Sequence, residues 1–84
     1  MITNNLDKMQ VDIVASFYDL GYTFMRKDKN IIEFSNGYYY IHFYIKQKEY
    51  YSEDKKSIVK VLIDYCINNF DVLLKEIENI EGGK

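Results

Sequence analysis

Apolar positions over 31–46 alternate with other residues and predict a β-hairpin. Two runs rich in aromatic and β-branched residues flank the pair Asn36-Gly37. This pair favours a type I′ turn of two residues, because both central residues of that turn need positive φ. The turn would pair Ser35 with Tyr38, and alternation would then form one core face. That face consists of Ile32, Phe34, Tyr39, Ile41, Phe43 and Ile45.

The first part of the chain predicts a helix over 5–20. Apolar residues recur there at steps of three and four, which is typical of one buried helical face. These positions are Leu6, Met9, Ile13, Phe17 and Leu20. Gly21 follows directly, where a left-handed residue ends many helices, and Tyr22 can pack back over the last turn.

A first strand is predicted over 22–27, and a short turn joins it to the hairpin. With three residues in that turn, Phe24 lies opposite Phe34, and Arg26 lies opposite Ile32 at the end of the sheet. A turn of two residues would instead bury the alternate side chains of this strand. Both registers stay open at this point.

Residues 47–54 are polar and charged and predict a loop, whereas the segment from 57 onward predicts a helix that is apolar nearly all round. Such a helix is usually buried centrally or covered by another element. Continued unbroken to Ile80, it would have about 28 residues and span about 40 Å, longer than a compact domain of this size. We therefore expect a break at Asn68-Asn69 and a short third helix beginning near Asp71.

Together these elements predict an α+β fold in a single domain, 1–84. The order is α-β-β-β-α, with a further short helix possible at the C-terminus. The three strands form an antiparallel meander, the smallest sheet that is stable independently. The helices would pack on one face of this sheet and leave the other to solvent or to a partner.

Composition and charge narrow the class of protein. The chain has 84 residues, 48% of them hydrophobic, and a formal net charge of −2. These values are typical of a small globular protein and argue mildly against a general nucleic-acid binder. The single cysteine, Cys66, excludes an intramolecular disulfide and a cysteine-based zinc site. We see no signal-like segment and no apolar run of membrane length, so we expect a cytoplasmic protein without a membrane span.

The sequence offers no set of residues for catalysis, for a metal or for a cofactor. His42 is the only histidine, and Glu33, diagonal to it across the predicted strands, is the one carboxylate that could orient it. A lone histidine rarely forms a metal site, and Cys66 in its apolar helix is typical of an inert buried thiol. Paired carboxylates at working spacing, a nucleophile–base pair and a glycine-rich phosphate loop are all missing. We therefore do not expect an enzyme.

The second face of the predicted hairpin is the strongest candidate for binding. Tyrosine supplies a large contact area at low entropic cost and dominates binding hot spots. A half-solvated pleat, or a face covered by the apolar helix, is an equally weighted interpretation. A homodimer through this face or through the apolar helix is a competing form of the same idea. The predicted partner-binding residues are Tyr38, Tyr40, His42 and Tyr44, with Glu33 beside them and Tyr50 and Tyr51 flanking.

Lysines at the start of the apolar helix support a nucleic-acid alternative. The α-β-β-β-α order, with Lys55, Lys56 and Lys60 at that position, resembles the double-stranded-RNA-binding domain. In that family such lysines straddle phosphates across a groove, so the resemblance implies RNA binding through them. Lys27 and Lys29 in the first hairpin turn are further candidates. The run KKSIVK is one residue longer than the usual lysine spacing of that family.

A second resemblance favours a protein partner. In size, acidity, residue usage and element order, the chain resembles small single-domain inhibitors carried by phages, including anti-CRISPR proteins. The resemblance implies inhibition by protein–protein contact, with a CRISPR or other defence nuclease as the partner. Acidic residues that could mimic a phosphate backbone, or simply form a solvated surface, are Glu49, Glu53, Asp54, Asp71, Glu76, Glu78 and Glu81. We therefore expect a small interaction protein, with an inhibitor from a phage or mobile element as the leading hypothesis.

Overall fold

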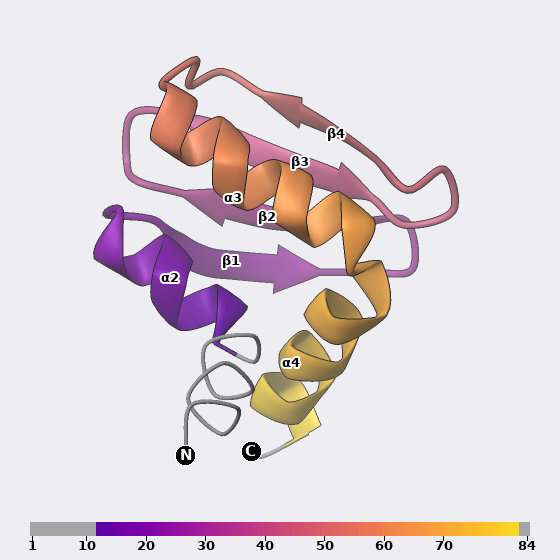
Figure 1. Cartoon of the computed structure of the whole chain (residues 1–84). Coiled ribbons are helices and arrows are strands. Elements are labelled where there is room, and N and C mark those ends of the chain that lie inside the picture. Colours follow the sequence, from indigo (N-terminus) through magenta and orange to yellow (C-terminus); the bar gives the residue numbers. More distant parts are fainter. Residues whose placement is uncertain (1–11, 83–84) are drawn as a thin grey trace, which may run out of the picture.

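The computed structural model describes residues 12–82, and Figure 1 shows how they are arranged. The four strands form one antiparallel sheet in the order β1-β2-β3-β4. The α+β class expected from the sequence is therefore confirmed for this part of the chain. The elements within it are α2 (Ile13–Asp19), β1 (Thr23–Lys27), β2 (Ile31–Ser35), β3 (Tyr40–Tyr44), β4 (Glu49–Ser52), α3 (Ser57–Asn68) and α4 (Phe70–Gly82).

The three described helices lie on the same side of the sheet (Figure 1) and share one hydrophobic core with it. Phe34 of β2 stacks on Phe17 of α2, with 4.3 Å between ring centroids, and meets Phe43 of β3 edge-on at 6.2 Å. Phe70 at the start of α4 meets Phe43 at 6.3 Å. Aromatic pairs of this kind contribute about 0.5–1.5 kcal/mol each beyond the burial of their area. The buried members of the core are Ile13, Phe17, Tyr22, Ile32, Phe34, Ile41, Phe43, Val59, Ile63, Cys66, Phe70, Leu73 and Ile77.

Helix α2 ends as the sequence predicts. Gly21 has φ +91°, and its N–H donates to the carbonyl of Tyr18 at 2.9 Å, while the N–H of Tyr22 donates to that of Phe17 at 2.8 Å. This pair of bonds is the Schellman motif, which satisfies carbonyls at a helix C-terminus. The helix predicted over 5–20 is confirmed over Ile13–Asp19, and residues 5–11 lie outside the described range.

The hairpin between β2 and β3 does not have the predicted two-residue turn. Ser35 pairs with Tyr40 rather than with Tyr38, which leaves a loop over 36–39. Because the register shifts by two residues, every strand residue keeps its predicted face. Tyr39, however, lies in the loop instead of the core and is 41% exposed.

The side chain of Asn36 explains this longer loop. Its Oδ1 accepts hydrogen bonds from the N–H groups of Tyr38 at 2.8 Å and Tyr39 at 2.7 Å. Gly37 has φ +92°, but Asn36 is not among the residues with positive φ, and a type I′ turn needs both. The Asn-Gly pair therefore builds an Asx turn in place of the predicted type I′ turn.

A β-bulge in β1 changes the register of the first strand. Phe24 lies opposite Phe34, as the three-residue turn predicts, but the register shifts between Phe24 and Arg26. Arg26 consequently lies opposite Glu33 rather than opposite Ile32. A bulge adds one residue to one strand and turns the following side chain to the other face. Arg26 thus belongs to the face away from the helices.

The fourth strand, β4, lies where the sequence predicts a loop. It pairs with β3, so that Tyr50 is opposite Phe43 and Tyr51 is opposite His42. Its four residues include one glutamate and one serine, which is too polar and too short for the periodic signal of a strand. The sheet therefore has four strands instead of the three expected, while the meander order is as predicted.

The last two helices are separate, as the length argument predicts. The break lies at Asn69, whose side-chain amide and backbone N–H both donate to the carbonyl of Tyr65, at 2.9 and 3.0 Å. The carbonyl of Asn69 then accepts hydrogen bonds from Val72 and Leu73. α4 has 13 residues and is longer than the short helix expected.

Glu76 of α4 holds the start of α2 in place. Its carboxylate oxygens accept hydrogen bonds from the backbone N–H groups of Ile13 at 2.9 Å and Val14 at 3.1 Å. The first N–H groups of a helix have no partner within the helix, so an acceptor there is stabilising. Asp12, at the usual capping position, makes no such side-chain bond. Glu76 is therefore a structural residue rather than part of a solvated acidic surface.

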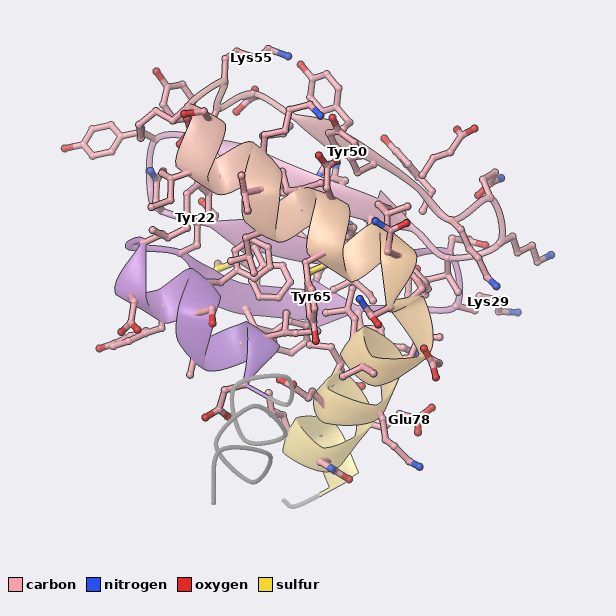
Figure 2. All side chains as sticks on the ribbon, viewed as in Figure 1. Tyr22, Lys29, Tyr50, Lys55, Tyr65 and Glu78 are labelled. Carbon is pink, nitrogen blue, oxygen red and sulfur yellow. The ribbon has the colours of Figure 1, made fainter. Side chains whose placement is uncertain are left out.

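Removal of this carboxylate should destabilise the fold. We predict that Glu76→Ala lowers the free energy of unfolding by about 1–2 kcal/mol, because two N–H groups lose their acceptor. Glu78→Ala is the matched control: Glu78 is exposed on the same helix and points away from the core (Figure 2). Urea unfolding followed by circular dichroism measures both, and equal effects of the two changes would contradict the assignment.

Candidate functional site

The candidate site is the outer face of the sheet, which we define as the face turned away from the helices. None of the described helices packs on this face (Figure 1). The strand register brings together residues from all four strands across it. Its members include Arg26, Ile31, Glu33, Tyr40, His42, Tyr44, Glu49 and Tyr51.

A row of directly paired residues crosses the middle of the outer face. Arg26 lies opposite Glu33, Glu33 opposite His42, and His42 opposite Tyr51. Glu33 Oε1 accepts a hydrogen bond from Arg26 Nε at 3.2 Å and lies 3.5 Å from His42 Nε2. Arg26 Nη1 also contacts Asp28 Oδ2 at 3.1 Å. The sequence placed Glu33 diagonal to His42, whereas the two-residue register shift makes them direct partners.

Aromatic rings form a second feature, at right angles to this row. Along β3 the imidazole of His42 lies between Tyr40 and Tyr44, with ring centroids 6.2 and 6.4 Å away. Tyr40 is 47% exposed, and Tyr51 on the neighbouring strand is 51% exposed. We call these three rings the Tyr40–His42–Tyr44 strip. The row of paired residues and this strip cross at His42. The outer face thus presents aromatic surface around a polar centre whose groups are already paired.

Two of the predicted partner-binding tyrosines lie outside the strands of the outer face or on its opposite side. Tyr50 pairs with Phe43 and packs against the core, on the same side of the sheet as α3 (Figure 2), and therefore does not share the outer face with Tyr51. Tyr38 lies in the β2–β3 loop rather than in the strand, and 86% of it is exposed. Tyr51, expected to flank the tyrosine row from a loop, lies on the outer face as part of β4. Alternation within β4 accounts for the opposite positions of Tyr50 and Tyr51.

Sequence reasoning missed Arg26 and Glu49 as members of the outer face. The bulge that turns Arg26 outward has no glycine or proline to mark it. Glu49 opposes Tyr44 only because β4 exists. A period-two reading of Glu49–Ser52 was the only available signal for β4, and four residues are too few to establish it.

The predicted lysine cluster is largely engaged within the fold. Lys56 Nζ lies 3.1 Å from Asp54 Oδ2 and 5.9 Å from the centre of the Tyr39 ring. Lys60 Nζ lies 3.0 Å from Asp64 Oδ2, and this hydrogen bond raises the pKa of Lys60. Lys55 Nζ donates to the carbonyl of Ser52 at 3.1 Å. Two of the three ammonium groups thus have a carboxylate beside them.

The remaining lysines are not close to this cluster. Figure 2 shows Lys55 near one end of the molecule and Lys29, in the β1–β2 turn, well away from it. Lys27 ends β1 on the same side as that turn. The two lysine groups therefore do not form one continuous basic stripe of the kind that tracks a nucleic-acid backbone.

Asp54 is the centre of a buried polar network between β4 and α3. Its Oδ2 accepts a hydrogen bond from the Tyr22 hydroxyl at 2.8 Å, and its Oδ1 accepts one from the N–H of Lys56 at 3.0 Å. Burial disfavours the charged carboxylate, but the hydrogen bonds from Lys56 and Tyr22 outweigh this effect and lower the pKa of Asp54. Burial and the neighbouring carboxylate raise the pKa of Tyr22.

Two of the proposed phosphate mimics are accordingly structural. Asp54 is buried, as described, and Glu53 pairs with Tyr40 through two bonds. Tyr40 N–H donates to Glu53 Oε1 at 2.9 Å, and Glu53 N–H donates to the carbonyl of Tyr40 at 3.2 Å. These bonds extend the β3–β4 ladder by one residue. The acidic loop is therefore part of the sheet's edge.

Cys66 is buried in the core, and burial raises the pKa of its thiol to about 12. A thiol with such a pKa is almost entirely protonated near neutral pH and is a poor nucleophile. Within residues 12–82 no group of three or more histidine, cysteine or acidic side chains could hold a metal ion. No helix in the same range has the length and hydrophobicity of a membrane span.

Comparisons with protein-family models, with curated proteins and with solved structures gave no match for this chain.

The Asp54 network predicts a specific loss of stability in acid. The pKa of Asp54 is lower in the folded chain than the ordinary value of 3.8. The contribution of this carboxylate to the free energy of unfolding is therefore complete above about pH 4 and is lost as pH falls through the pKa of the folded state. We predict that the wild type is about 1–3 kcal/mol more stable than Asp54→Asn near neutral pH. This advantage should shrink as pH falls from about 4 to about 2.

Urea unfolding of both proteins over this pH range measures the difference directly. Other carboxylates, such as Asp28, whose pKa is lowered by hydrogen bonds from the Asn30 and Ile31 N–H groups, are common to both proteins and cancel. A difference that stays constant with pH would contradict the role given to Asp54.

Proposed function

We propose that this chain is a protein-binding module whose partner contacts the outer face of the sheet. The observation that carries the proposal is the Tyr40–His42–Tyr44 strip, which lies on a face that no described helix covers. Exposed apolar or aromatic patches with polar groups around them are typical of interaction surfaces. Binding, rather than catalysis, is the activity that this arrangement supports.

The residue types on the outer face are those that dominate binding energy. Tyrosine and arginine are enriched at interface hot spots, and the face carries Tyr40, Tyr44, Tyr51 and Arg26. Arg26 is held by Glu33 and by Asp28, so its position is fixed before a partner arrives. Side chains that are already ordered lose less conformational freedom on binding. The centre of the face is therefore suited to specific recognition.

The area of the face indicates that neighbouring loops take part. Four strands spaced about 4.8 Å apart and about 17 Å long present a small patch, whereas a stable interface buries about 800 Å² on each partner. Tyr38, which projects from the β2–β3 loop, would enlarge the patch at one end.

The class of partner is a further part of the proposal. It rests on the resemblance of the sequence to small phage-borne inhibitors, which favours a subunit of a bacterial defence nuclease. Under this hypothesis the chain inhibits by occupying a protein surface. A nucleic-acid partner is less favoured, because the lysines expected to bind phosphate are mostly paired with Asp54 and Asp64.

Substitution of the aromatic strip should abolish binding without unfolding the protein. We predict that Tyr40→Ala with Tyr44→Ala weakens partner binding at least tenfold, because each lost hot-spot tyrosine costs about 1 kcal/mol or more. Tyr18→Ala is the matched control, since Tyr18 is 70% exposed on α2, which packs on the other side of the sheet. The tagged full-length chain is first used to capture its partner from a bacterial lysate, with and without nuclease, and affinities are then measured on the purified partner.

The outcomes of this experiment are distinct. One protein retained after nuclease treatment, and lost with the double variant only, supports the proposal. Recovery of nucleic acid alone, or equal loss with Tyr18→Ala, contradicts it. If the double variant fails to fold, the outer face is part of a core, and Tyr51→Ala provides an independent test of its role in binding.

A further inference from the structure

A groove of about 380 Å³ lies between α2 and α3, on the side of the molecule away from the outer face. Tyr65 is one of its lining residues, and its side chain extends from α3 toward the other helices (Figure 2). Most of the lining is apolar. The lining residues are Asp12, Ile13, Ser16, Asp19, Leu20, Ile58, Val61, Leu62 and Tyr65.

The rim of this groove carries apolar side chains that the core does not use. Ile58 and Val61 are 59% and 68% exposed, whereas their helix neighbours Val59 and Ile63 are buried. An α-helix places residues three apart on one face, so Ile58 and Val61 form a stripe of their own beside the groove. β-branched side chains also have low helix propensity, and an exposed position gains nothing from them in folding.

The charges of the groove all have one sign. Asp12 and Asp19 are the charged members of the lining, and neither forms an ion pair within residues 12–82. Of the residues that the structure describes, no lysine or arginine lines the groove. Carboxylates beside apolar walls attract positive charge more strongly than they would in open water. The groove is therefore complementary to a ligand that is apolar on one side and basic at its edges.

We propose that this groove binds an amphipathic helix of a partner protein, with lysine or arginine flanking an apolar face. An open channel between two helices, with apolar residues on its floor and rim, matches the helix-in-groove mode of recognition. The partner's apolar side chains, spaced at i, i+3 or i+4 and i+7, would cover Leu20, Ile58 and Val61. Its basic side chains would approach Asp12 and Asp19. This site is separate from the outer face and does not depend on the function proposed for it.

A pair of synthetic peptides tests the proposal on the full-length chain. One is a helical peptide of 18 residues with leucine at i, i+3, i+4 and i+7 and lysine at the flanking positions, and the other has glutamate in place of every lysine. Titration followed by ¹⁵N–¹H NMR spectra gives both the affinity and the location of binding. We expect the lysine peptide to bind at least tenfold more tightly and to shift the amide signals of Leu20, Val61 and Leu62.

Two variants separate the apolar and the charged contributions. Val61→Glu should remove binding of the lysine peptide, because a carboxylate would replace an apolar contact in the middle of the site. Asp12→Asn with Asp19→Asn should reduce the preference for lysine over glutamate to less than threefold. Glu78→Gln with Glu81→Gln changes the net charge by the same amount on α4 and should leave the preference unchanged.

Four results would overturn the proposal. The first is equal binding of the two peptides, and the second is a set of shifted signals on the outer face instead of the groove. The third is a dimer of the free chain in light scattering that Val61→Glu dissociates, since a second copy would then be the occupant. The fourth is an equal effect of the Asp12/Asp19 and Glu78/Glu81 variants on the preference for the lysine peptide. The net charge of the chain, rather than the groove, would then account for that preference.

Discussion

The stacking of Phe34 on Phe17 is the contact on which the rest of the structure depends. It joins the middle of the sheet to α2 at 4.3 Å between ring centroids, and Phe34 also meets Phe24 and Phe43 edge-on. Because successive residues of a strand point to opposite faces, burial of Phe34 on the helix side commits Glu33 to the other side. All three described helices pack against this aromatic cluster, on the same face of the sheet. The tyrosine-rich outer face is the necessary counterpart of this one-sided core.

Several charged side chains near the candidate surfaces form hydrogen bonds or ion pairs that stabilise the fold. Asp54 organises the junction of β4 and α3, Glu76 supplies the acceptors for α2, and Glu33 is shared by Arg26 and His42. These residues do not form an open array of carboxylates, so mimicry of a phosphate backbone is not the basis of the proposed binding. Recognition at the outer face would rest on aromatic contact around a fixed polar centre. Recognition at the α2–α3 groove would instead depend on Asp12 and Asp19, whose carboxylates form no ion pair within residues 12–82.

The sequence predicted faces better than it predicted registers. Alternation along Ile31–Ser35 and Tyr40–Tyr44 correctly separated buried from outward residues at every position except Ser35, which is buried although its position in the alternation is outward. An error of two residues in the register preserves every face. The error itself arose because a side-chain acceptor on Asn36 competes with the backbone geometry of a type I′ turn. β4 was missed because an edge strand of four residues needs few apolar side chains, and Tyr50 was misplaced as a result. Long-range pairings such as Glu76 with α2, or Arg26 with Glu33 across a bulge, leave no local pattern in the sequence.

The central claim is that the outer face is open while the opposite face is core, and photo-CIDNP NMR tests it residue by residue. This method polarises only those tyrosine and histidine rings that a dissolved dye can reach. The experiment uses the full-length chain at a concentration where light scattering gives the mass of one copy. Tyr18, 70% exposed, and Tyr22, 1% exposed, are the internal positive and negative controls. The account predicts polarised signals from Tyr40 and Tyr51 and none from Tyr22. Silent Tyr40 and Tyr51 beside a polarised Tyr18 would show that the face is covered, and would contradict the account.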